Sequence, residues 1–281
     1  MQKFISRLDN FQSRHRILAI SFAVIKKYGE DEAGHQAALF TYYAFLALFP
    51  LLLVLATLTE FITTSHSSLQ ATIISGTTNY FPVLGTQLAD HVHTLHKNGL
   101  ALLVGIVFTV YGARGVADAF QRGVQNIWGV PKSQRAGFPH STLKSLYIIL
   151  IGGVGFVVAS LSIGWAGATG QGALSQVLTV VINLIIWSAL FILLLNISLP
   201  RHVPFKETRT AALTAAVGLV ILQIAGGYII RRELRHLDAL YSYFALALGL
   251  LFWIYLQVQV LFYALELAAV RYHKLWPRSL R

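Results

Sequence analysis

The chain has 281 residues, a net charge of +11 and no cysteine, and its mean hydropathy is +0.62. Charged residues make up 12% and hydrophobic residues 56%, whereas soluble domains carry about 25% charged residues, so the composition excludes an ordinary soluble domain. The lack of cysteine excludes a disulfide, a thiolate nucleophile and a cysteine-ligated metal. Basic chains can bind nucleic acid, but lysine and arginine also accumulate on the cytoplasmic loops of membrane proteins, and we expect no nucleic-acid partner.

The first 35 residues are charged and show no cleavable signal peptide. Residues 4–28 mix apolar with basic side chains, which predicts an amphipathic N-terminal segment on the cytoplasmic membrane surface. The first apolar run of sufficient length covers residues 36–62. About 20 such residues cross roughly 30 Å of hydrocarbon, so this run predicts the first transmembrane helix, an uncleaved anchor.

A polar segment, 63–99, separates this run from five further apolar runs. Their ranges are 100–119, 146–168, 174–199, 208–230 and 241–270. Backbone groups in lipid must be hydrogen-bonded within their own element, so each run is predicted to be a helix. The sequence therefore predicts one all-α membrane domain, a bundle of about six transmembrane helices.

The orientation of this bundle follows from the distribution of lysine and arginine. Eighteen of the 22 such residues fall at the two ends of the chain or in loops on the same side as the ends. The other four are Lys97, Arg231, Arg232 and Arg235. Because lysine and arginine favour cytoplasmic loops, both termini are predicted in the cytoplasm and 63–99 is predicted as an external loop.

The external loop contains the densest group of potential metal ligands in the sequence: Asp90, His91, His93 and His96. On a helix, His93 and His96 would share a face with Asp90, and metal-dependent phosphodiester hydrolysis needs such a set beside a positioned water. This loop, however, is predicted to lie outside, away from cytoplasmic RNA. We interpret it as a solvated histidine-rich loop, and predict no metal, cofactor or catalytic residue.

Ionisable residues within a transmembrane helix are costly and usually have a partner or a function. Arg114 lies about 14 residues into the second predicted helix, roughly 21 Å from its outer end, and Asp118 shares its face four residues later. Glu266 lies near the inner end of the last helix, at similar depth. These three residues, with Gln257, are predicted to form an intramembrane polar network. A structural role and a role in binding substrate or protons both stay open.

Three arginines lie on the predicted external side of the membrane, where the fifth predicted helix ends. Arg231 and Arg235 are four residues apart and would share a helical face with Arg232 beside them. Guanidinium groups suit phosphate oxygens, and the nearest phosphates are outer-leaflet headgroups, so the three are candidates for a lipid headgroup site. The alternative is local pairing with Glu233 and Asp238.

Five sequence features occur in a characteristic order and spacing. They are AALFTYYAFLALFPLLLVLATL at 37–58, GVADAFQRGVQNIWGV at 115–130, Leu199–Pro200, Gly227–Tyr228, and YSYFALALGLLFWIYLQVQVLFYALELAAV at 241–270. Together they resemble the YihY/BrkB family, bacterial inner-membrane proteins once labelled ribonuclease BN. The resemblance implies six helices and an inner-membrane location, and no settled activity.

Two functional hypotheses fit these features. The first is a non-enzymatic membrane protein that binds or translocates a lipid-like, amphiphilic solute between its helices, with membrane lipids as its partners. The second is an envelope scaffold that docks a partner protein through residues 63–99. An enzyme, including a ribonuclease, is disfavoured because the sequence presents no evident nucleophile–base pair or metal-ligand set.

Overall fold

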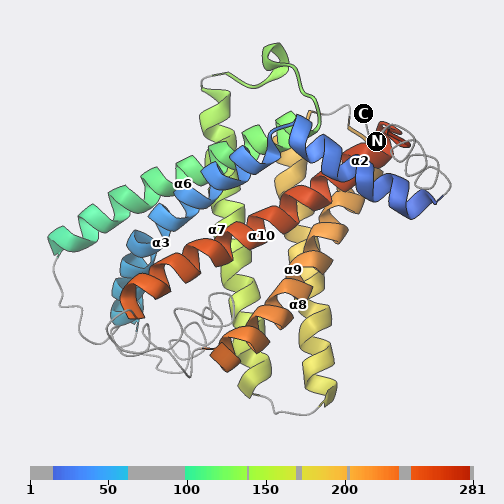
Figure 1. Ribbon diagram of the computed structural model, residues 1–281. Helices are drawn as coiled ribbons and strands as arrows, with labels where there is room; N and C mark the ends of the chain where they lie inside the picture. The colour runs from blue at the N-terminus through green and yellow to red at the C-terminus, as the bar shows by residue number, and fades with distance from the viewer. Residues whose placement is uncertain are drawn as a thin grey trace.

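A computed structural model describes residues 15–62, 99–137, 139–168, 173–200, 203–233 and 242–278. Within these ranges the regular structure is helical throughout, which confirms the predicted all-α class. A short helix, α2 (Arg16–Glu30), comes first, and a 3₁₀ turn, η3 (Lys132–Gln134), lies between two longer helices. The long helices are α3 (Ala33–Ile62), α6 (Gly99–Ile127), α7 (His140–Ala168), α8 (Ala173–Ser198), α9 (Phe205–Glu233) and α10 (Ser242–Tyr272) (Figure 1).

Each predicted apolar run coincides with one long helix, and the largest difference is at the end of α6. This helix continues to Ile127, well past the predicted end at residue 119. Polar residues interrupt its apolar run, but Ala117, Phe120, Val124 and Ile127 are all buried. Their spacing of three and four residues is that of one helical face, so α6 changes from an apolar helix to an amphipathic one without ending.

Four of the described helices contain a stretch long and apolar enough to cross a membrane. These stretches are His140–Ser162, Leu174–Ser198, Phe205–Gly226 and Ala247–Tyr272. Their outward faces keep large apolar side chains exposed, such as Leu150 and Ile185, each 62% exposed. Lipid tails can cover such faces, whereas water would disfavour them. The chain is a multi-pass membrane protein.

The six long helices form a closed ring of neighbours. Helix α3 packs against α6, α6 against α7, α7 against α8, α8 against α9, α9 against α10, and α10 again against α3. Figure 1 shows α3, α6 and α10 running side by side, with α7 and α8 packed on each other at a steep angle to them. The short helix α2 packs on α10 and α3, so it joins the first and last described parts of the chain.

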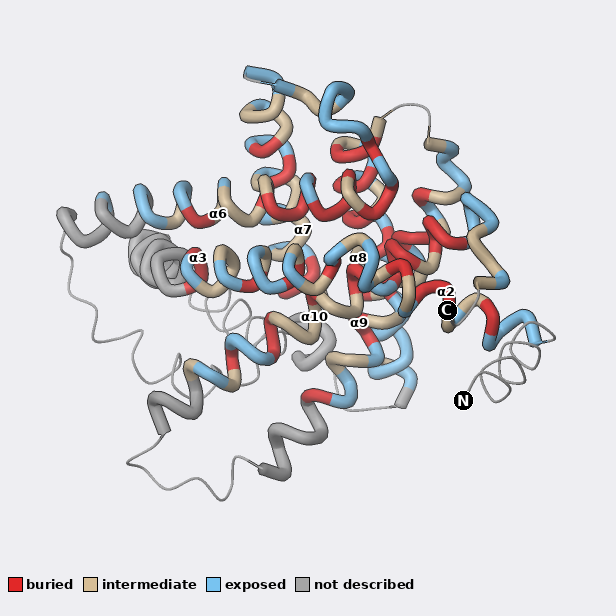
Figure 2. Tube along the Cα trace, turned by 45° about the horizontal axis from the view of Figure 1, so that its top comes forward, coloured by how far each residue is buried: buried red, intermediate tan, exposed pale blue. Residues whose placement is uncertain are grey.

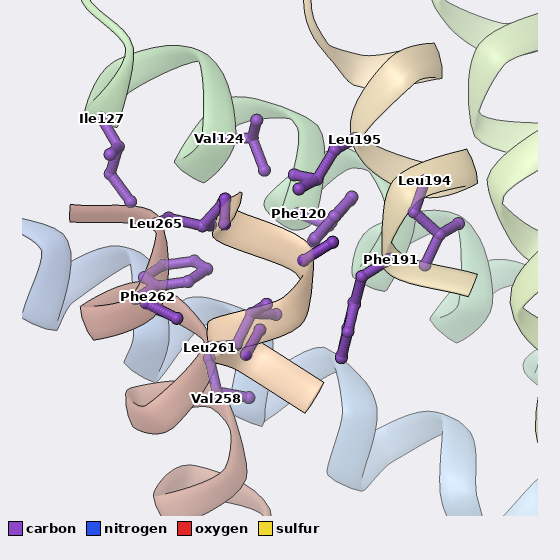
Figure 3. Packing of buried hydrophobic residues seen from close by; sticks show 14 of the residues in the cluster. Phe120, Val124, Ile127, Phe191, Leu194, Leu195, Val258, Leu261, Phe262 and Leu265 are labelled. Carbon is purple, nitrogen blue, oxygen red and sulfur yellow. The ribbon is translucent and has the colours of Figure 1, made fainter. Parts of the chain in front are cut away.

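The buried core lies toward the end of the ring where α2 meets α10. Figure 2 shows buried positions gathered there. Figure 3 shows the packing within this cluster, with side chains from α6, α8 and α10 in contact. The labelled residues are Phe120, Val124, Ile127, Phe191, Leu194, Leu195, Val258, Leu261, Phe262 and Leu265. This well-packed end surrounds the charged residues described next.

Candidate functional site

A buried cluster of three charged side chains connects α2, α6 and α10. The Lys27 ammonium donates hydrogen bonds to Glu266 Oε2 at 2.9 Å and to the Ile127 carbonyl oxygen at 2.7 Å, and it pairs with the Asp31 carboxylate. The Glu266 side chain is 0% exposed and that of Lys27 is 8% exposed. We call Lys27, Asp31 and Glu266 the buried triad. All three ammonium hydrogens have an acceptor, as a buried lysine requires.

The end of α6 is shaped to receive this lysine. Gly129 has a φ of +62°, and its N–H bonds the Asn126 carbonyl at 2.9 Å while the N–H of Val130 bonds the Gln125 carbonyl at 2.8 Å. These two bonds form a Schellman motif, which ends the helix and satisfies two of its last carbonyls. The Ile127 carbonyl then accepts from Lys27, and the negative end of the helix dipole favours that cation.

Aromatic and polar contacts extend the attachment of α2 to α10. The Tyr28 hydroxyl donates a hydrogen bond to Gln259 Oε1, and its ring stacks on Tyr263 with centroids 4.3 Å apart. Burial raises the pKa of Tyr28 to about 12, so this hydroxyl stays protonated and remains a donor at neutral pH. Farther along, Arg278 pairs with Glu30. The last turn of α2 is therefore held to about two turns of α10 and to the segment that follows α10.

The buried triad has an unequal charge balance. It contains one cation and two carboxylates, and Asp31, with a side chain 23% exposed, is the only member that solvent reaches appreciably. Glu266 Oε2 is bound by Lys27, but Glu266 Oε1 has no hydrogen-bond partner among the described residues. A buried acceptor without a donor is costly, so this oxygen is a place where a proton, a water or the donor group of a solute can bind.

The structure corrects the predicted partners of Arg114. Its guanidinium hydrogen-bonds Thr142 Oγ1 at 3.5 Å, and no ion pair joins it to Asp118 or Glu266 among the described residues. Asp118 Oδ1 instead accepts from Ser145 Oγ at 2.6 Å. Gln121 Nε2 also bonds that hydroxyl, at 3.0 Å. We call this contact between Arg114, Asp118, Gln121, Thr142 and Ser145 the α6–α7 seam.

Helix register explains the difference. Through Lys27, Glu266 lies level with Ile127 at the end of α6. Arg114 is thirteen residues earlier in that helix, about 20 Å away along its axis, so the two side chains cannot meet. The prediction that Arg114 and Glu266 lie at similar depth assumed that the second helix ends at residue 119. The helix instead continues to Ile127, so Arg114 lies near its middle.

Of the remaining predicted site residues, the structure describes the side chain of Gln257 but not those of the three arginines. Gln257 is half-buried on α10, and Gln259, not Gln257, bonds α2. The side chains of Arg231 and Arg232, and all of Arg235, lie outside the described residues, as do Asp90, His91, His93 and His96 in the predicted external loop. Over the described ranges, no three histidine, aspartate or glutamate side chains are close enough to hold a metal ion.

Lys27 and Asp31 were not predicted as site residues, although the sequence contains a signal for them. Lys27 lies four residues after Ala23 and eight after Ala19, so the three share one face of α2, and both alanines are buried. A lysine on the small, buried face of an amphipathic helix is out of place unless it has an anionic partner. Asp31 is four residues farther on, and Glu266 supplies the second carboxylate.

The family comparison agrees with the motifs. The family described as virulence factor BrkB matches residues 24–279. The chain belongs to the BrkB family. This is the YihY/BrkB family that the sequence resembles, and the match includes the whole buried triad, from α2 to α10. Neither the curated proteins nor the solved structures contain a significant match to this BrkB-family chain.

Proposed function

We propose that this BrkB-family protein spans the bacterial inner membrane six times, with both termini in the cytoplasm. Four helices are apolar and long enough by themselves, and α3 and α6, of 30 and 29 residues, have the length of the other two. The distribution of lysine and arginine gives the orientation. Six crossings return the chain to its starting side, so a cytoplasmic N-terminus requires a cytoplasmic C-terminus.

Reporter fusions test this topology. Fusions after Lys132 and after Arg278 should both report cytoplasm, and a fusion after Thr94 should report the outside. An external signal after Arg278 would contradict the six-helix count, because an odd number of crossings would then be required. The same cells, fractionated into inner and outer membranes, give the location.

We further propose that the protein is not an enzyme and that it binds or translocates a lipid-like, amphiphilic solute. The buried triad carries this proposal: a fully buried carboxylate and a buried lysine lie at the well-packed end of the ring, and no described residue donates a hydrogen bond to Glu266 Oε1. Charges inside a membrane domain are costly and commonly mark pathways for solutes or protons. The apolar outer faces of the helices would admit the tails of an amphiphile, and the buried triad would receive its head.

Proteoliposomes provide the test. The purified protein is reconstituted with a fluorescent short-chain phospholipid, and dithionite added outside measures how fast inner-leaflet label reaches the outer leaflet. Wild-type protein should accelerate this exchange relative to protein-free liposomes. A Lys27→Met/Glu266→Leu variant removes the two buried charges together and leaves the partly exposed Asp31. It should remain folded and lose most of the acceleration.

Arg122→Gln is the matched control, because it removes an exposed charge on α6 that is not a member of the triad, and it should keep the wild-type rate. Exchange no faster than in protein-free liposomes for the wild type would rule out translocation. The scaffold hypothesis, with docking through residues 63–99, would then be the better one.

A further inference from the structure

Arg114 is an exposed guanidinium on the membrane-facing side of α6. Its neighbours on that helix, Val110 and Tyr111, are 54% and 68% exposed and apolar or aromatic. Its hydrogen bond to Thr142 Oγ1, at 3.5 Å, is long, and no carboxylate pairs with it within the described part of the chain. A cation in this setting needs an anion, because burial of arginine among lipid tails without one is costly.

The contact with Thr142 places Arg114 at the edge of the hydrocarbon. The apolar stretch of α7 begins at His140, so Thr142 lies in its first turn, where a transmembrane helix enters the headgroup layer. Arg114 reaches this level from the middle of α6. The first turn of a helix also has a partial positive charge, which adds to the attraction for an anion.

An apolar stripe leads from this point along α7. Leu146, Leu150, Gly153 and Val157 follow Thr142 at spacings of four, eight, eleven and fifteen residues, which keeps them on one face. All four are exposed. From Leu146 to Val157 the stripe is about 16 Å long, close to the roughly 15 Å of one leaflet of a 30 Å hydrocarbon core.

We propose that Arg114 and Thr142 bind the phosphate of a phospholipid in the cytoplasmic leaflet, with one acyl chain along the α7 stripe. The guanidinium donates two hydrogen bonds to phosphate oxygens, which a lysine could not do in the same planar geometry, and the Thr142 hydroxyl donates a third. Only the leaflet depends on the proposed topology. The site stands independently of translocation, because it lies on the outside of the ring and away from the buried triad.

Native mass spectrometry of the full-length protein in detergent tests the site. Delipidated protein is titrated with dioleoylphosphatidylglycerol, with dioleoylglycerol, which lacks the phosphate, and with inorganic phosphate. The phospholipid should bind, dioleoylglycerol should bind at least tenfold more weakly, and millimolar phosphate should not displace the lipid. Arg114→Gln should weaken phospholipid binding by about tenfold or more, and Thr142→Val by about two- to fivefold.

The control is Arg122→Gln, which removes the same charge from an exposed position two turns along α6 and should change binding less than twofold. Melting temperatures in the same detergent show whether each variant is folded, and Thr142→Val decides the outcome if Arg114→Gln melts lower. The proposal is overturned if Arg114→Gln and Arg122→Gln weaken binding equally, or if dioleoylglycerol binds as well as the phospholipid. Displacement by millimolar phosphate would overturn it in favour of a free-phosphate site.

Discussion

The buried triad and the α6–α7 seam differ in how their charges are compensated. In the triad, Glu266 and Lys27 are almost completely removed from solvent, and each is the other's partner across 239 residues of sequence. In the seam, Asp118 is half-buried and bonded by neutral groups, while Arg114 is exposed. Burial, more than sequence proximity, therefore decides which charges must be paired. Arg114 and Asp118 are four residues apart and still take separate neutral partners.

This contrast implies different costs for the loss of a partner. A charge left alone in a buried site keeps its desolvation penalty, whereas a charge at a lipid–water boundary can recruit water or a headgroup. The triad also connects three helices, and the seam connects two. Substitutions in the triad should therefore affect stability most.

Lys27→Met should have the largest effect. It leaves Glu266 buried without its cation and removes the cap from the Ile127 carbonyl. Loss of one partner of a buried ion pair costs about 3–5 kcal/mol, so the free energy of unfolding should fall by that amount. Unfolding in mixed detergent micelles, followed by circular dichroism, measures it. Lys206→Met, at an exposed position on α9, is the matched control and should change little.

The double variant Lys27→Met/Glu266→Leu tests most directly whether the cost of losing Lys27 comes from the unpaired charge of Glu266. Replacement of a whole buried pair by apolar side chains is often neutral or stabilising, so the double variant should be more stable than Lys27→Met alone. If the two variants are equally destabilised, Glu266 does not depend on Lys27. The buried triad would then be a packing site with no special role for its charges.

The helices of this fold were predictable, and the partners of its charges were not. Apolar runs fix where the helices lie because lipid admits little else, and all six ranges coincide with helices. The partner of Glu266 depends on how α2 and α10 are aligned, and no local pattern encodes an alignment between segments so far apart. The family motif at 115–130 contains the Gly129 turn that positions the Ile127 carbonyl, but its role is visible only once Lys27 lies against it.

Gly112→Ala should have the next largest effect. Together with its control, it compares the contact between α3 and α6 with the outward side of α7. A Cβ at this position of α6 would lie 2.8 Å from Ala47 Cβ and 2.9 Å from Ala47 Cα on α3, so the α3 backbone would have to shift. Overpacking of this kind costs about 1–3 kcal/mol. Gly152→Ala on α7 is the control: apart from its own helix, no described residue lies within 4 Å of the added Cβ. Alanine is favoured over glycine in a helix by about 1 kcal/mol, so that variant should be as stable as the wild type or more so.

The same unfolding assay measures both glycine variants. Equal destabilisation of the two would mean that α3 and α6 are no more closely packed than the lipid-facing side of α7. A large loss for Gly112→Ala alone would support close contact between these two helices near the first of the family motifs. The predicted order of stability is Gly152→Ala, wild type, Gly112→Ala.

Asp118→Asn should have the smallest effect, and it tests the seam itself. If Asp118 were the counter-ion of Arg114 in a site as buried as the triad, loss of its charge would strand a cation and cost several kcal/mol. In the structure Asp118 Oδ1 accepts from Ser145 Oγ, and an asparagine carbonyl oxygen can accept the same hydrogen bond. The remaining difference is that between a charged and a neutral acceptor, so the expected cost is at most about 1 kcal/mol. Asp118→Leu, which cannot accept at all, should cost more because the Ser145 hydroxyl then keeps only its longer hydrogen bond, to the Ser141 carbonyl at 3.1 Å. If Asp118→Asn were instead as damaging as Lys27→Met, Arg114 and Asp118 would be paired after all, and the distinction between the triad and the seam would fail.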